Sequence, residues 1–310
     1  MPLLIPFAST LSEASRHALR DLALPNLAKL LAHSRPVARW GGDEYTLTPP
    51  HERALAEAQG WSGDDGALPW AALHAAQDGI APGDDAWGEL TPAHWHVGRD
   101  HISLADPLAL GLAAAESRTV FDAVRPLFES EGWRMAWGAP TRWYAAHESL
   151  HGLPCASLDR VIGRNVDVWL PPHPAARLVR RLQNEVQMLL YRLPLNDARE
   201  ARGALAVNSF WLSGCGRAQA VAAREPVQVD DRLRRPALDE DWAAWADGWR
   251  ALDADPLAEL ARRARDGETV SLVLCGERHA ERHDAEPPSA WQRITRAWRA
   301  TPVHERLEAL

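Results

Sequence analysis

Short apolar runs alternate with helix-like segments along this chain of 310 residues, and this alternation constrains the fold more than any other feature. Residues 174–191 place leucine and valine at spacings of four, four and three residues, which predicts a helix with one apolar face. Runs typical of buried strands are LLIPF at 3–7, ALAVNSFWL at 204–212 and TVSLVLC at 269–275. Strands separated by helices predict a layered α/β protein with a largely parallel sheet and room for a small inserted subdomain.

Proline, glycine and capping residues mark where further elements begin and end. Residues 34–93 are rich in Gly, Pro and Asp, so we expect a loop-rich helical insertion there, with one helix at 50–59. A strand near 95–104 precedes Asp106 and Pro107, a pair typical of a helix start, and helical sequence extends to Glu131. The other predicted elements are helices at 13–22, from 25, near 239–252, 256–266 and 288–300, and a hairpin of strands near 133–137 and 141–145.

The composition is that of an ordinary globular protein, with 46% hydrophobic and 25% charged residues. A chain of this length buries enough surface to form a core without a disulfide or a structural zinc ion. Cys155, Cys215 and Cys275 form no Cys-x-x-Cys pair, so their spacing indicates neither a disulfide framework nor a thiolate metal site. We therefore expect a reducing, cytoplasmic location.

The charge pattern argues against two classes of partner. The net charge is -8, with acidic and basic residues interspersed, so the chain lacks the basic footprint of a protein that binds nucleic acid or an anionic membrane. The opening MPLLIPFAS has no basic residue before its apolar run, and no apolar run approaches the roughly 20 residues of a membrane helix. We expect neither nucleic acid nor membrane as a partner.

Two groups of histidines and acidic residues have spacings that suit metal binding. His94, His96 and His101 lie near Asp100, and a strand would place the first two on one face, which is also the pattern of a half-buried strand with a polar outer face. His279 and His283 are four residues apart, beside Glu277 and Asp284, within the polar segment GERHAERHDAEPP. That segment is compatible with a divalent ion on a helix or with a solvated loop, and its charge pattern favours the loop.

Motifs of nucleophilic catalysis and nucleotide binding are missing from the sequence. The chain has no Gly-x-Ser-x-Gly elbow, no P-loop and no Gly-x-Gly-x-x-Gly after a strand. The segment SGCGR at 213–217 follows a predicted strand, and its backbone N–H groups could hold an anion. A tight turn that reverses the chain explains the same residues, and we favour that interpretation.

Arginine and amide side chains are concentrated between residues 142 and 217, which suggests a site for a small anionic ligand. Forked guanidinium groups hold carboxylates and phosphates, and asparagines orient hydroxyl groups. The alternative is a set of helix-surface arginines with turn-capping asparagines, and both interpretations stay open at Asn208, which lies inside an apolar strand. The predicted ligand-binding residues are Arg142, Arg164, Asn165, Asn196, Arg199 and Asn208.

Several segments resemble known proteins. LPLNDAREARGALAVNSFWLSGCGR at 193–217 and PNLAKLL at 25–31 resemble cofactor-independent phosphoglycerate mutases, members of the alkaline phosphatase superfamily. HWHVGRDHISLADP, TRWYAAH, LDRVIGRNVDVWLP and RRLQNEVQMLLY resemble bacterial phosphoglycerate-mutase-related proteins described as RpfE-type regulatory proteins. The resemblance implies one domain over 1–310, a three-layer α/β sandwich like alkaline phosphatase, with 34–93 as the insertion and 94–217 as the most family-like segment.

The resemblance also implies a ligand set that this chain does not match. Active members of the superfamily have a metal-binding aspartate at the end of the first strand, a hydroxyl nucleophile soon after it, and Asp-x-x-x-His and Asp-His pairs near the last strands. Here the corresponding positions are Pro6-Phe7-Ala8 and Cys275-Gly276-Glu277. Two divalent ions at a phosphoryl group need several oxygen and imidazole ligands. Hydroxyl groups near the nucleophile position remain on Ser9, Thr10 and Ser12.

We therefore expect a catalytically degenerate, phosphoglycerate-mutase-like bacterial protein, a pseudoenzyme without a resident cofactor. Its expected role is regulatory, through a small anionic metabolite or a protein partner. The alternative is an active metal-dependent phosphomutase or phosphatase that holds two divalent ions, such as manganese, with one of the histidine groups.

Overall fold

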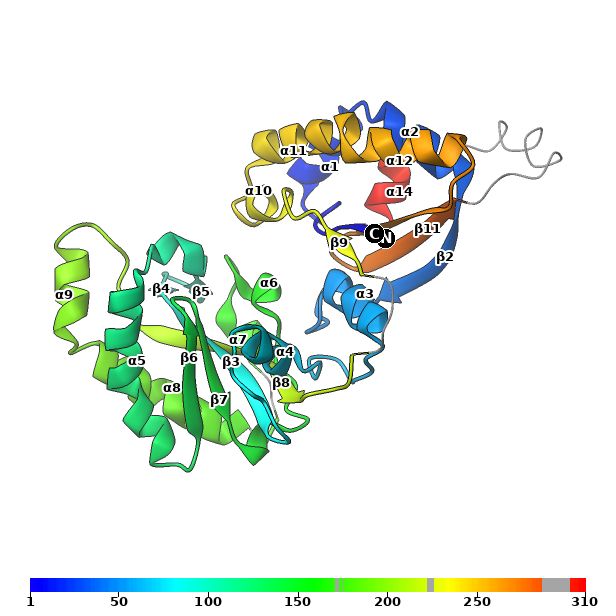
Figure 1. The fold of residues 1–310 in the computed structure, drawn as a ribbon. Coiled ribbons are helices and arrows are strands. Elements are labelled where there is room, and N and C mark those ends of the chain that lie inside the picture. Colours follow the sequence, from blue (N-terminus) through cyan, green and yellow to red (C-terminus); the bar gives the residue numbers. More distant parts are fainter. Residues whose placement is uncertain (171–172, 175, 222–225, 286–301) are drawn as a thin grey trace. The chain divides into compact units, whose positions relative to one another are not determined.

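The chain packs as two compact units, each with its own sheet and core. Unit 1 consists of residues 1–60 and 222–310, and unit 2 of residues 61–221. The inserted segment is therefore 61–221, whereas the sequence predicted one domain with an insertion at 34–93. Figure 1 shows the fold of this computed structural model, which describes residues 1–170, 173–174, 176–221, 226–285 and 302–310.

Unit 1 is built on a mixed five-stranded sheet with the order β2-β11-β10-β1-β9. Its strands are β1 (Leu3–Ile5), β2 (Ser34–Gly41), β9 (Gln228–Val229), β10 (Val270–Cys275) and β11 (His279–Ala285). Strand β1 pairs in parallel with β9 and β10, while β11 pairs antiparallel with β10 and β2. Because β1 and β10 lie between other strands, their side chains must be buried on both faces of the sheet.

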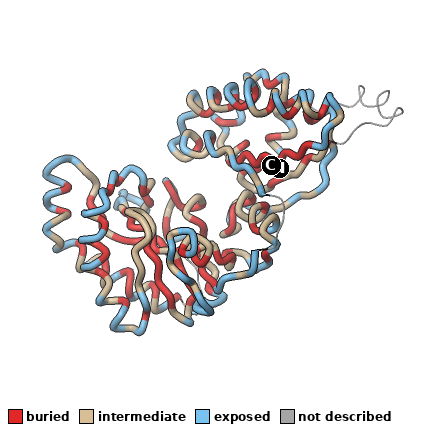
Figure 2. The backbone as a smooth tube through the Cα atoms, in the orientation of Figure 1, coloured by how far each residue is buried: buried red, intermediate tan, exposed pale blue. Residues whose placement is uncertain are grey.

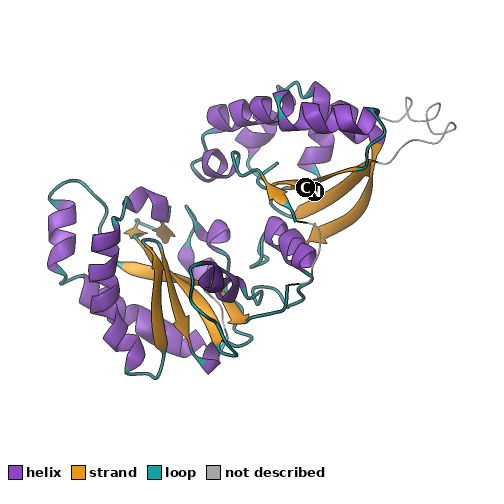
Figure 3. Ribbon diagram, in the orientation of Figure 1, coloured by secondary structure: helices purple, strands orange, loops and turns teal. Residues whose placement is uncertain are grey.

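Helices cover the two faces of this sheet unequally (Figure 3). Leu3, Ile5 and Leu272 face a core formed with most of the described helices, whereas Leu4 and Val273 face α3. This alternation follows from the two-residue period of a strand. The helices on the first face are α1 (Glu13–Arg20), α2 (Pro25–His33), α10 (Arg234–Leu238), α11 (Trp242–Ala254), α12 (Pro256–Arg265) and α14 (Val303–Glu308), and α3 is Pro50–Gln59.

Unit 2 contains an antiparallel four-stranded sheet with the order β6-β7-β3-β8. Its strands are β3 (Ala86–Ala93), β6 (Arg134–Ala139), β7 (Arg142–Ala146) and β8 (Ser209–Arg217), and a separate hairpin joins β4 (Trp95–Val97) to β5 (Ile102–Leu104). Its helical segments are α4 (Trp70–Gln77), η1 (Pro107–Leu110), α5 (Ala114–Glu129), η2 (Glu148–Leu150), α6 (Leu158–Val161), α7 (Val166–Trp169), α8 (Ala176–Leu190) and α9 (Pro194–Glu200). Buried residues follow the central strands of each unit (Figure 2).

The structure confirms a mixed α/β protein but not a largely parallel sheet. Only the pairs β1·β9 and β1·β10 are parallel among the described strands. Strands joined by short connections, such as β6 with β7 and β10 with β11, pair antiparallel because a short loop reverses the chain. The sequence predicted the hairpin of β6 and β7, but not the hairpin of β10 and β11, whose second strand is densely charged.

Several predicted elements have different outcomes. The helix at 50–59 and the hairpin near 133–145 are confirmed. The predictions of a loop at 276–288 and of a tight turn at 213–217 are wrong, because 279–285 is strand β11 and the glycine segment continues β8 through a bulge. The predicted helix at 288–300 lies outside the described residues. No described helix combines the length and the apolar character needed to cross a membrane.

One buried carboxylate caps a helix from a distant part of the chain. Helix α2 begins after Leu24, which supplies no capping oxygen, but Asp253 Oδ1 accepts hydrogen bonds from the backbone N–H groups of Asn26 at 3.1 Å and Leu27 at 2.8 Å. These N–H groups would otherwise have no partner inside the helix. Asp253 is 5% exposed, so water replaces it poorly.

We expect Asp253→Ala to lower the free energy of unfolding by about 2 kcal/mol, because it leaves one buried and one half-buried backbone donor unpaired. Urea denaturation of the purified chain measures this change. Asp247→Ala is the matched control, since Asp247 lies on the same helix with its side chain 75% exposed. Equal effects of the two substitutions would contradict the capping role.

Candidate functional site

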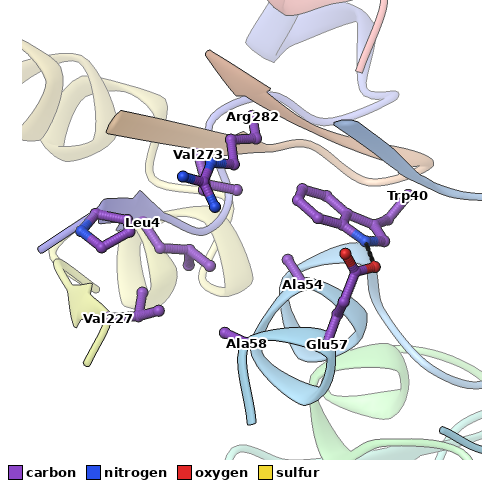
Figure 4. A pocket seen from close by; sticks show the side chains of 9 residues that line it. Leu4, Trp40, Ala54, Glu57, Ala58, Val227, Val273 and Arg282 are labelled. Atoms are coloured by element: carbon purple, nitrogen blue, oxygen red, sulfur yellow. Dashed lines mark hydrogen bonds between the residues drawn. The ribbon is translucent and has the colours of Figure 1, made fainter. Parts of the chain in front are cut away.

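A cavity of unit 1 lies between the sheet and α3. Its volume is about 300 Å³, at the lower end of the range for small-molecule sites. Figure 4 shows the lining residues, which are Pro2, Leu4, Trp40, Ala54, Glu57, Ala58, Val227, Val273 and Arg282. They come from β1, β2, α3, β10, β11 and the segments beside β1 and β9.

The cavity exists because α3 presents small side chains to the sheet. Leu4 and Val273 are buried and form its floor, and Ala54 and Ala58 of α3 lie opposite. An alanine side chain ends at Cβ, so it fills little of the space between a helix and a sheet. The same face in a fully packed protein would carry larger residues on the helix.

One cation and one carboxylate stand at this apolar cavity. Arg282 Nε donates to Asp284 Oδ1 at 2.8 Å, and within the described residues its two terminal nitrogens have no protein partner. Trp40 Nε1 donates to the Glu57 carboxylate, which turns toward the indole (Figure 4). Arg282 therefore keeps free donors beside the cavity, although Asp284 offsets part of its charge.

This combination suits a small amphipathic anion. The carboxylate or phosphate group would accept hydrogen bonds from the Arg282 guanidinium, and an apolar body would lie against Leu4 and Val273. A guanidinium keeps its proton, so Arg282 can hold an anion but cannot act as a general base.

The predicted ligand-binding residues all lie in unit 2, and their polar groups contact other parts of that unit. Asn196 donates to the backbone oxygens of Leu190 and Val207 and accepts from Val207 N–H at 2.9 Å. Arg199, which is fully buried, donates to Leu205 O at 2.8 Å and to Glu116 Oε2 at 2.6 Å. Both side chains hold the loop after α9 in place.

Asn208 and Asn165 also bond to neighbouring backbone. Asn208 pairs with the backbone of Trp95 through both its amide oxygen and its amide nitrogen, at 2.7 and 2.9 Å. Asn165 accepts from Asp167 N–H and caps α7, and the guanidinium carbon of Arg164 lies 5.9 Å from the centre of the Trp169 ring. The half-buried amide of Asn208 thus joins the β4 hairpin to the start of β8.

Arg142 belongs to a polar cluster with Asp78 and Tyr144. Its Nε and Nη2 donate to the two oxygens of Asp78 at 3.0 and 2.7 Å, and Tyr144 Oη donates to the same carboxylate at 2.6 Å. The hydrogen bond from Arg142 lowers the pKa of Asp78, while burial raises the pKa of Tyr144. Both oxygens of Asp78 accept hydrogen bonds from Arg142, so this guanidinium already holds a carboxylate of the protein.

The structure does not bring the six predicted residues to one place. Asn196, Arg199 and Asn208 surround the segment 204–208, Arg164 and Asn165 adjoin β5, and Arg142 contacts Asp78. None of them lines the unit 1 cavity. Ligand binding by these residues stays a prediction.

The described part of the chain contains no group of three or more His, Cys, Asp or Glu side chains arranged to hold a metal ion. His94 Nδ1 lies 2.8 Å from Ala206 O, and its ring centre is 6.4 Å from that of His96. His279 and His283 lie on β11, and burial lowers the pKa of each. His283 Nε2 lies 3.1 Å from Glu281 Oε2.

The hydroxyl groups near the end of β1 belong to a helix start. Ser12 Oγ caps α1 by accepting from Ser15 N–H, and Thr10 Oγ1 donates to Ser15 Oγ at 2.7 Å. Ser9 is 5% exposed, and Glu277 accepts from the N–H of Leu11. The turn between β1 and α1 is thus held by its own side chains and by the loop after β10.

Sequence reasoning missed Arg282 and Trp40. Arg282 lies in the polar segment that was predicted as a loop, where neighbouring charges mask the alternation of a strand. Trp40 is the second-last residue of β2, whose residues are all exposed or half-buried. A search for the two-residue period of a strand over 279–285 could have found β11, in which Ala280, His283 and Ala285 are buried.

Comparisons with known proteins give distant likenesses. No family model matches the chain, and no curated protein matches it. Among solved structures, the chain is similar to a cofactor-independent phosphoglycerate mutase from Thermoplasma acidophilum, with 13% identity, a TM-score of 0.39, and 99% of this chain and 98% of that chain covered. It is also similar to the PH0037 protein from Pyrococcus horikoshii, with 13% identity, a TM-score of 0.45, and coverage of 92% and 87%.

The Asp78 cluster predicts a pH dependence of stability. The pKa of Asp78 in the folded chain lies below the ordinary aspartate value of 3.8. The contribution of Asp78 to the free energy of unfolding is therefore present above pH 3.8 and is lost as the pH falls through the folded pKa. We expect Asp78→Asn to cost about 1–2 kcal/mol at neutral pH, allowing for the partial exposure of Arg142, and to cost progressively less below about pH 4.

Urea denaturation at a series of pH values measures this difference. Asp85→Asn serves as the control, because Asp85 pairs with Arg134 and both side chains are at least half exposed. A cost of Asp78→Asn that does not change with pH would contradict the assignment.

Proposed function

We propose that this chain is a regulatory protein that binds a small anionic metabolite, related to phosphoglycerate mutases but without their catalysis. Its binding site is the unit 1 cavity. The observation that carries the proposal is Arg282, whose terminal nitrogens stand at an apolar cavity of about 300 Å³ without a partner among the described residues. A buried or half-buried cation with free donors favours an anionic ligand.

The loss of catalysis rests on residue types at two positions. The resemblance places metal ligands after the first and last strands of the sheet, and this chain has Phe7 and Ala8 after β1 and Gly276 after β10. At these positions Glu277, which follows Gly276, supplies one carboxylate, and this carboxylate accepts a hydrogen bond from Leu11 N–H. One carboxylate falls short of the several ligands that two divalent ions need. The hydroxyl groups of Thr10 and Ser12, close to the expected nucleophile, are hydrogen-bonded to the first turn of α1.

The cavity also limits the class of ligand. Its floor and the helix side are aliphatic, and Trp40 adds one aromatic surface, so the ligand has an apolar or flat body. Glu57 opposes a second negative group on the ligand at the Trp40 end. A monoanionic carboxylate or phosphate monoester with a small hydrocarbon body therefore fits better than a highly charged sugar phosphate.

We expect a compound of this class to raise the unfolding temperature of the chain, since a ligand that binds only the folded state stabilises it. Thermal unfolding with a panel of small carboxylates, phosphate monoesters and both phosphoglycerates identifies the compound, and calorimetry measures its dissociation constant. The panel is run with and without manganese. If none of the compounds shifts the unfolding temperature, the proposal fails.

Two substitutions locate the bound compound. Arg282→Met should weaken binding by about 10- to 100-fold, the loss expected for a charge-assisted hydrogen bond. Ala58→Leu should also weaken binding, because a larger side chain on α3 fills the cavity. Arg39→Met is the matched control, as Arg39 is on the same sheet but bonds to Glu281 and the Ala309 carbonyl. Unchanged affinity in Arg282→Met would place the ligand elsewhere.

A further inference from the structure

Two cysteines of unit 2 lie in contact although they are 60 residues apart in sequence. The sulfur atoms of Cys155 and Cys215 are 3.5 Å apart, and both residues are buried and reduced. Cys275 is buried too, but it belongs to unit 1. A disulfide bond is about 2.05 Å long, so a small rotation of the two side chains would bring the sulfurs to bonding distance.

The backbone holds both cysteines in position. The N–H of Cys155 donates to Gly66 O at 2.9 Å, and the carbonyl of the next residue, Ala156, accepts from Trp211 Nε1 at 2.9 Å. Cys215 is part of β8, and Gly88 of the neighbouring strand leaves room for its sulfur, since a Cβ at Gly88 would lie 3.2 Å from it. The two thiols are therefore presented to each other by a strand and by a segment tied to that strand.

A small cavity reaches one member of the pair. Its volume is about 20 Å³, room for a molecule of the size of water, and its lining includes Cys155 but not Cys215. Cys215 is fully buried, and the hydrogen bond with Cys155, followed by burial, raises the pKa of its thiol. Cys155 is thus the thiol that a small oxidant meets first, and Cys215 is its nearest reaction partner.

We propose that Cys155 and Cys215 form a redox site, in which a peroxide oxidises Cys155 and Cys215 resolves it to a disulfide. In the first step the Cys155 thiol gives up its proton, and its sulfur attacks one oxygen of hydrogen peroxide. The O–O bond breaks, Cys155 becomes a sulfenic acid, and the departing hydroxide takes up the thiol proton and leaves as water. In the second step the Cys215 sulfur attacks the sulfenic sulfur, and its own proton leaves with the hydroxyl group as a second water.

The two cysteines together lose two electrons and two protons, and one hydrogen peroxide gains them. The bond would tie the segment after η2 to β8 and would close a loop of 60 residues within unit 2. Such a cross-link restricts the unfolded chain more than the folded one. A thiol compound such as dithiothreitol reverses the reaction by exchange.

The test treats the full chain with hydrogen peroxide, blocks free thiols with iodoacetamide under denaturing conditions and maps the peptides by mass spectrometry. We expect the peptides of Cys155 and Cys215 to be joined within one chain, with the mass reduced by two hydrogens, and Cys275 to be alkylated. The unfolding temperature should rise by about 5 °C on oxidation and return with dithiothreitol.

Variants separate this reaction from general oxidation. Cys155→Ala and Cys215→Ala should each abolish the cross-link and the shift in unfolding temperature, whereas Cys275→Ala should keep both. If a variant fails to fold, the peptide map of the wild-type chain still shows whether Cys155 and Cys215 are joined. The proposal is overturned if both thiols alkylate fully after peroxide, if Cys155 proceeds to the sulfinic acid without a link, or if links form only between chains.

Discussion

The two central strands of unit 1 must be covered on both faces, and the candidate site is a consequence of how that requirement is met. All six residues of β10 are buried, so each face of the sheet needs an apolar layer. Six of the described helices supply one layer, whereas the described part of the other layer is the ten-residue helix α3, which presents alanines. Because α3 covers the sheet without filling the space above it, a cavity remains, and its floor is formed by strands β1 and β10.

The sequence predicted those parts of the fold in which the apolar side chains themselves indicate which residues are buried. The apolar runs of β1 and β10 and the amphipathic pattern of α8 mark burial directly, and the structure contains all three elements. Strand β11 was missed because its pairing with β10 and β2 depends on backbone hydrogen bonds and not on apolar residues. Likewise β3, the centre of the unit 2 sheet, contains glycine and proline, which usually mark loops.

The site was harder to predict than the fold because residue type does not tell what a polar group contacts. Arg199 and Arg142 each have a guanidinium that could bind an anion, but in the structure these groups donate to the carboxylates of Glu116 and Asp78. Arg282 lies in a segment where charge is dense, and a strand sends alternate residues to opposite faces, so one of those charges reaches the cavity. Arg282 differs from Arg142 and Arg199 in that its terminal nitrogens have no partner among the described residues, and the sequence does not show this difference.

The cysteines show that burial alone does not decide reactivity. Cys275 and Cys215 are both fully buried, and burial raises the pKa of Cys275, which keeps its thiol protonated and inert. Cys215 is buried as deeply, yet it touches a second sulfur that adjoins a cavity. An oxidised Cys155 would therefore find its resolving thiol in contact, without the need for an external thiol to enter the core. The difference between an inert and a reactive cysteine in this chain is thus the neighbour, and the sequence separation of 60 residues hides that neighbour.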